Sequence, residues 1–140
     1  MTKEANVKNY YKKKYLKNYL KEKYEIKINM DIMSRIIDNL RKRAFPYTRN
    51  LKMTVMELLG CSKEQLEEFI ISKFTEKMSL QNYGEWEMDH IKSLASFNLN
   101  NIDEVKKCFH YTNLQPLWLK DNRSKGARYH RPSTIDHHLR

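Results

Sequence analysis

The first 52 residues contain two stretches in which apolar side chains recur at spacings of three and four, the period of an amphipathic helix. The first stretch runs from Val7 to Tyr24, where tyrosines and leucines stand between lysines. The second begins at Asp31, a residue type that caps helices, and we expect it to end at Pro46 because proline breaks a helix. The apolar stripe of this second helix consists of Ile32, Met33, Ile36, Ile37 and Leu40.

Two further helices are expected after residue 53. Ser62 and Gln65 have the spacing of a capping box, which predicts a third helix that begins there and ends near Phe74. Its core-facing residues are Leu66, Phe69, Ile70 and Phe74. Residues 103–109 again have helical spacing, through Val105 and Phe109.

Short extended segments separate these helices. Residues 86–88 predict a strand that delivers the next two residues, Asp89 and His90. We expect residues 113–116 to be irregular, because proline breaks both helical and sheet hydrogen bonding. A short strand at 117–118 then leads to a last helical turn that begins at Asp121 and stops at Gly126.

These elements predict an α+β fold that is mostly helical, with a small core near residues 79–127 packed on helices from residues 31–75. We divide the chain into a basic helical arm (1–52), a domain (53–127) and a tail (128–140). The tail contains three histidines, His130, His137 and His138, and lacks periodicity. These histidines could bind metal, but we interpret the segment as a solvated tail.

Composition narrows the class of protein. A chain of 140 residues fits one compact domain with an extension. It lacks an apolar run of about 20 residues and a signal-type apolar N-terminus, so we expect a soluble, intracellular protein with no membrane span. Cys61 and Cys108 are far apart and form no CxxC pair, which favours buried thiols in a reducing compartment.

The positive charge is concentrated at one end of the chain. The net charge is +10, and residues 1–52 hold 15 Lys and Arg against 5 Asp and Glu, whereas residues 53–140 hold 12 of each. Such an arm attracts polyanions, either nucleic acid or an anionic membrane surface. We assign most of the tyrosines in the first helix to packing. The DNA contacts that we predict for the arm are Lys12, Lys13 and Lys14, and Arg41, Lys42 and Arg43 either contact phosphates or complement the helix dipole.

Three short motifs carry the chemistry. They are Asp89-His90, then Asn113-Leu114-Gln115, then Asn122-x-x-Lys125-Gly126. In this order they resemble the HNH endonuclease family, and the resemblance covers residues 53–126, counting the stretch 58–62 that often precedes the motif in phage and large-virus relatives. It implies a ββα-metal fold, in which two short antiparallel strands and a helix hold one divalent cation against the scissile phosphate, and it is compatible with a phage or viral origin.

The resemblance also implies roles for individual residues. His90 would be the general base that accepts a proton from water, which a neutral imidazole can do near pH 7. Asp89, which we count with His90 and Asn113 among the catalytic residues, and Asn122 would be the metal ligands. Their hard oxygens favour Mg²⁺ or Mn²⁺. Asn113 would fasten the loop between the strands and so orient His90.

Other residues near the motifs have open roles. Lys125 and Arg123 either contact phosphates beside the scissile bond or are solvated at the helix end. Glu87 could approach the metal, and for His110 we favour packing or a backbone hydrogen bond. One geometric difficulty is that neighbouring strand residues point to opposite faces, so Asp89 and His90 can serve one phosphate only if the strand bends or ends there.

The sequence thus predicts a metal-dependent DNA endonuclease that acts on double-stranded DNA and uses no organic cofactor. Its oligomeric state is left open. The alternative is a non-catalytic nucleic-acid-binding protein with a vestigial site. A protein that uses its first helix as a membrane-surface anchor would need a larger apolar face than the tyrosines provide.

Overall fold

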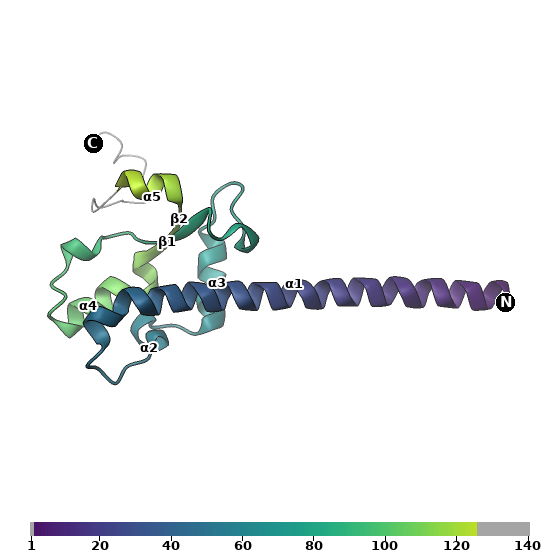
Figure 1. Cartoon of the computed structure of the whole chain (residues 1–140), viewed down its shortest axis with the longest axis horizontal. Coiled ribbons are helices and arrows are strands. Elements are labelled where there is room, and N and C mark those ends of the chain that lie inside the picture. Colours follow the sequence, from purple (N-terminus) through teal and green to yellow (C-terminus); the bar gives the residue numbers. More distant parts are fainter. Residues whose placement is uncertain (1, 126–140) are drawn as a thin grey trace.

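The computed structural model describes residues 2–125. The chain begins with one long helix, and the elements that follow gather around the second half of that helix (Figure 1). Helix α1 (Lys3–Thr48) precedes α2 (Val55–Leu59) and α3 (Lys63–Ser72). Along the chain, α4 (Ile102–Phe109) lies between strands β1 (Trp86–His90) and β2 (Leu114–Trp118), and α5 (Leu119–Lys125) follows β2. Short 3₁₀ helices lie at Leu80–Asn82, Leu94–Ser96 and Tyr111–Asn113. The described chain is therefore mostly helical with one two-stranded antiparallel sheet, as the predicted α+β class requires.

The two helices predicted in the first 52 residues are one continuous helix, and both expected boundaries were wrong. Asp31 is an interior residue, and the N-cap is Thr2, whose hydroxyl accepts from the Ala5 amide at 3.2 Å. Residues 25–30 contain neither glycine nor proline, so nothing in them ends a helix. Pro46 lies in the last turn, where the absence of one hydrogen bond leaves the helix intact until Thr48.

The two halves of α1 have different surroundings. Nearly every side chain from residue 3 to 27 is exposed, and this exposed segment extends away from the rest of the protein by about 36 Å at the helical rise per residue. The predicted apolar stripe of the second half is buried, as its spacing indicated, and it consists of Ile32, Met33, Ile36, Ile37 and Leu40, with Ala44 one turn further on. One helix therefore serves as both an extension and a core element.

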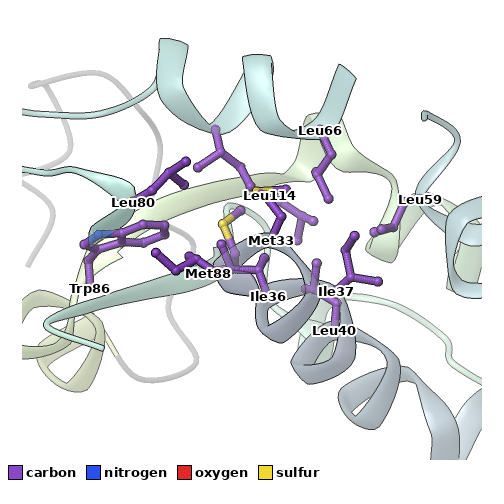
Figure 2. Close-up of a cluster of buried hydrophobic side chains, with 12 residues drawn as sticks. Met33, Ile36, Ile37, Leu40, Leu59, Leu66, Leu80, Trp86, Met88 and Leu114 are labelled. Atoms are coloured by element: carbon purple, nitrogen blue, oxygen red, sulfur yellow. The ribbon is translucent and has the colours of Figure 1, made fainter. Parts of the chain in front are cut away.

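The main core lies between α1, the sheet and α3. Figure 2 shows Met33, Ile36 and Leu40 of α1 beside residues that come from elsewhere in the chain. The buried members from the other elements are Leu59, Leu66, Ile70, Leu80, Trp86, Met88 and Leu114. A second cluster joins α1, α2 and α4 through Ala44, Leu58, Val105, Cys108 and Phe109. Cys108 is buried as predicted, whereas Cys61 is only half-buried.

Capping boxes start both short helices that follow α1. The predicted box at Ser62 and Gln65 is confirmed, and α3 ends two residues before the expected position. The same arrangement at Thr54 and Glu57 begins α2, which the hydrophobic pattern had not indicated. Gly60 ends α2 with φ of 74°, and a Cβ there would lie 2.8 Å from the His110 ring, so both the backbone and the space require glycine.

The expectation that residues 113–116 are irregular was wrong for the last three of them. Pro116 lies inside β2, opposite Met88 in the antiparallel register. Backbone bonds flank the sheet at Ile91 N to Asn113 O (2.7 Å) and Leu119 N to Glu85 O (3.1 Å). Because bonded and non-bonded pairs alternate, the Pro116 pair is a non-bonded one, and its nitrogen faces away from β1. A proline is tolerated at such a position on an edge strand.

The last helix begins earlier than predicted, at Leu119 instead of Asp121. Its expected stop at Gly126 and the histidine-containing tail lie outside the described residues. The helix predicted at 103–109 is confirmed as α4, with Asn101 as its N-cap. Within residues 2–125, no helix is long and apolar enough to cross a bilayer.

Candidate active site

One face of β1 brings two acidic side chains against α5. The Asn122 Nδ2 donates to Glu87 Oε1 at 2.5 Å, and the Lys125 Nζ donates to Asp89 Oδ2 at 2.7 Å. Glu87 and Asp89 are two residues apart in the strand, and alternate strand residues share a face. The structure therefore assembles Glu87 with side chains of the first and third sequence motifs, Asp89, Asn122 and Lys125, into one polar cluster, which we call the acidic cluster.

Asp89 lies deep within the acidic cluster. The residue is 7% exposed, and its Oδ2 accepts from both Lys125 Nζ and Gln115 Nε2, the latter at 3.0 Å. Gln115 is the register partner of Asp89 on β2, which explains the contact. Within the described part of the chain, Oδ1 has no hydrogen bond. One carboxylate oxygen is thus occupied, and the other is available.

Of the two roles considered for Lys125, solvation at the helix end does not hold, because the side chain is buried. Its side chain is 3% exposed, and its Nζ also donates to the His90 carbonyl oxygen. The ion pair with Asp89 is buried, and removing either partner of a buried pair leaves an uncompensated charge. Arg123, the other predicted phosphate contact on α5, is exposed.

His90 faces the opposite side of β1. Its ring packs edge-on against Phe109 of α4, with centroids 4.8 Å apart and planes at 86°. The expected geometric difficulty is therefore present: the side chains of Asp89 and His90 contact different helices. The Nε2 of His90 is buried, and it has no hydrogen-bond partner within residues 2–125.

The surroundings of His90 favour the neutral ring. Burial is the main cause that lowers the pKa of His90 from 6.5 to about 4, and the cations Arg43 and Lys125 lower it further, while Asp89 opposes them. At pH 7 the imidazole is therefore uncharged, and one ring nitrogen can accept a proton.

Asn113 ties together the segments on either side of this face. Its Nδ2 donates to the carbonyl oxygens of Cys108 (2.8 Å) and Lys92 (3.1 Å), and its Oδ1 accepts from the Lys92 amide (3.0 Å). These bonds hold the turn that follows His90 against the end of α4. His110, for its part, packs over Gly60 and bonds to Thr112 through its Nδ1 at 2.7 Å.

The three consecutive cations of α1 separate into two kinds. Arg41 and Lys42 are exposed and pair with Asp38. Arg43 instead points to β1, where Nη1 donates to the Met88 carbonyl oxygen at 2.5 Å and Nη2 lies 3.7 Å from Glu87 Oε2. Arg43 therefore connects the long helix directly to the acidic cluster. Lys12, Lys13 and Lys14 lie on the exposed segment, far from this cluster along the helix.

The donor set of the acidic cluster suits a hard divalent cation better than zinc. The available oxygens are Asp89 Oδ1 and Asn122 Oδ1, with the Glu87 carboxylate on the same face, and Mg²⁺ and Mn²⁺ prefer such ligands. Among the described residues, no group of three or more His, Cys, Asp or Glu side chains could hold a metal. Phosphate and water oxygens would therefore have to complete the coordination.

Sequence reasoning left the role of Glu87 open and missed Gln115. The strand period of two places Glu87 on the face of Asp89, so its position beside a predicted metal ligand was available from the pattern alone. Gln115 could not be found in this way, because its contact with Asp89 depends on the register between two strands that are 23 residues apart.

The chain is similar to two uncharacterized proteins of Acanthamoeba polyphaga mimivirus. One is 34% identical over 65 residues, which cover 46% of this chain and 29% of that protein. The other is 34% identical over 92 residues, which cover 62% of this chain and 40% of that protein. The chain thus aligns with less than half the length of each relative. No family model matches the chain, and no solved structure matches it. The two relatives are viral proteins, which agrees with the viral origin considered above.

Proposed function

We propose that this protein is a metal-dependent endonuclease of the HNH type that hydrolyses phosphodiester bonds in DNA. The observation that supports this most is the acidic cluster. An antiparallel pair of strands, β1 and β2, is followed directly by α5. In chain order these elements carry residues of the three sequence motifs, and the side chains of β1 and α5 contact one another. This is the arrangement of two strands and a helix that the resemblance implies.

In this proposal Asp89 and Asn122 hold one Mg²⁺ or Mn²⁺, and Glu87 is placed to assist. A bound divalent cation neutralises the charge that grows on the phosphate and stabilises the departing oxygen. Asp89 contributes the negative charge and Asn122 a neutral oxygen, so the site relies on the substrate phosphate for further ligands and binds metal weakly alone.

His90 serves as the general base. Its ring is neutral at pH 7, and its Nε2 has no competing partner in the described chain. Although the ring lies on the other side of β1 from Asp89, His90 is the last residue of the strand, where the strict alternation of side chains ends. Asn113 holds the following turn and so orients His90.

Double-stranded DNA is the proposed substrate because of the charge distribution. Residues 3–27 hold nine lysines and three glutamates, and nearly all of these side chains are exposed. The helix that carries them also places Arg43 beside the acidic cluster. The exposed segment therefore supplies affinity for the phosphate backbone, and the cluster supplies the chemistry.

A second function, binding of nucleic acid without catalysis, is favoured by one specific observation. Asp89 is paired with Lys125 inside the protein, and His90 packs on Phe109. These two of the predicted catalytic residues thus have contacts that a purely structural role would explain.

A plasmid assay separates the two functions. With supercoiled DNA and a series of Mg²⁺ and Mn²⁺ concentrations, we expect the wild-type protein to nick or linearise the plasmid. We expect His90→Ala to lose at least about a hundredfold in rate, the usual contribution of a general base. His110→Ala is the matched control and should retain activity. Equal rates for wild type and His90→Ala would remove His90 as the base, and absence of any cleavage would favour the binding protein.

A further inference from the structure

Lys125 stands out among the charges of this protein because it is buried at a carboxylate that the proposed function uses for metal. Its side chain is 3% exposed, and its ammonium lies 2.7 Å from Asp89 Oδ2. It also donates to the carbonyl oxygen of His90. Its charge therefore lies between the proposed metal ligand and the backbone of the proposed base.

An ammonium ion and a divalent cation compete for such a place. Asp89 carries one negative charge, and Oδ2 already accepts from Lys125 and Gln115. A dication on the same carboxylate would lie within a few ångströms of the ammonium, and like charges at that distance in a buried setting repel strongly. The Asp89 carboxylate can therefore coordinate a metal ion without this repulsion only when Lys125 moves away.

Lys125 is able to move without unfolding the helix. A lysine side chain has a flexible stem of four carbons, and its compact charge forms bonds with no fixed geometry. Its neighbours on α5 include the exposed Lys120 and Arg123, which make this helix attractive to phosphate. A phosphate bound beside α5 offers the ammonium a new anionic partner.

We propose that Lys125 couples metal binding to nucleic-acid binding: it occupies Asp89 until a phosphate of the substrate draws it away, and the divalent cation then binds. This inference rests on the proposed function for the identity of the two ligands. Because such coupling is reciprocal, nucleic acid tightens metal binding and metal tightens nucleic-acid binding by the same factor. The cation then binds firmly only where substrate is present.

The first experiment measures Mn²⁺ binding to the full chain without DNA, by electron paramagnetic resonance of free Mn²⁺. Lys125→Met keeps an unbranched side chain of similar length and removes its charge, and we expect it to bind Mn²⁺ about tenfold or more tightly than wild type, within the usual range of coupling. Lys106→Met, which removes an exposed charge from α4, is the control and should stay near the wild-type value. Equal affinities of a folded Lys125→Met and wild type would overturn the proposal.

The second experiment needs no change at Lys125 and so remains decisive even if that variant unfolds. Fluorescence anisotropy measures the affinity of the His90→Ala protein for a DNA duplex with and without Mn²⁺, in a background without the proposed base. We expect Mn²⁺ to increase the affinity of the protein for the duplex several-fold. Unchanged affinity would contradict the coupling. Neither measurement uses cleavage, so the two proposals can fail separately. If the metal and the nucleic acid bind cooperatively but plasmid stays intact, the proposed nuclease activity is refuted and the role of Lys125 is supported.

Discussion

Lys125 and the nine lysines of the exposed segment are the same residue type in opposite settings. The lysines between residues 3 and 27 are exposed along a stretch of helix on which no other part of residues 2–125 packs, whereas Lys125 is buried and paired with Asp89. Exposed charges are screened and act together on a distant polyanion. A buried charge depends on one partner at one distance. In the proposed function the exposed segment provides long-range attraction and the buried pair belongs to the site of local chemistry, so single substitutions should have very different effects in the two regions.

The largest effect on stability is expected from Asp89→Ala. It leaves the Lys125 ammonium buried without its carboxylate, and breaking a buried pair in this way costs about 3–5 kcal/mol. Urea unfolding gives the free energy. Asp38→Ala, which removes an exposed carboxylate paired with Arg41 and Lys42, is the control and should lose less than about 1 kcal/mol. Similar losses in both variants would mean that the buried pair is not special.

A smaller effect is expected from acid. The pKa of His90 is lowered from 6.5 to about 4. As the pH falls from 6.5 to 4, this histidine is therefore protonated in the unfolded chain and stays neutral in the folded chain. His90 thus contributes its full stabilisation above about pH 6.5, and this contribution is lost progressively as the pH drops towards 4, by up to about 3 kcal/mol.

Unfolding free energies measured between pH 7 and 4 test this expectation. In His90→Gln this part of the pH dependence should disappear, while His110→Gln, at a half-buried histidine without this environment, should keep it. If the His90→Gln profile is as steep as that of the wild type, another group is responsible for the acid sensitivity.

The smallest effect on stability, and the clearest on binding, is expected in the exposed segment. Replacing Lys12, Lys13 and Lys14 by glutamine removes three exposed charges, so the unfolding free energy should change by less than about 0.5 kcal/mol. The dependence of duplex affinity on salt should become shallower, by up to about 0.9 in the logarithmic slope for each phosphate that the protein no longer neutralises.

Lys106 and Lys107, exposed on α4, provide the comparison for that triple variant. Their replacement by glutamine should leave the salt slope closer to that of the wild type, because they belong to the half of the chain without excess charge. If both variants flatten the slope equally for each charge removed, the exposed segment has no privileged role in holding DNA.

Features that depend on near neighbours were readable from the sequence. The capping box at Ser62 and Gln65 and the apolar stripe of the second half of α1 need only residues within a few turns, so the pattern identified them. The charge asymmetry is a property of composition alone. A strand leading to Asp89 and His90 and a short helix carrying Asn122 were also predicted from local signals, each with one boundary two residues away from the observed one.

Features that depend on a partner elsewhere in the chain were decided only by the tertiary structure. Pro116 lies in a strand because the register turns its nitrogen away from β1, and that register is set by packing. Lys125 is buried because α5 packs on the face of β1 that holds Asp89, which its helix-end position did not suggest. The sequence thus determined which groups could act, and the tertiary structure decided which of them meet, since burial and pairing arise between segments distant in the chain.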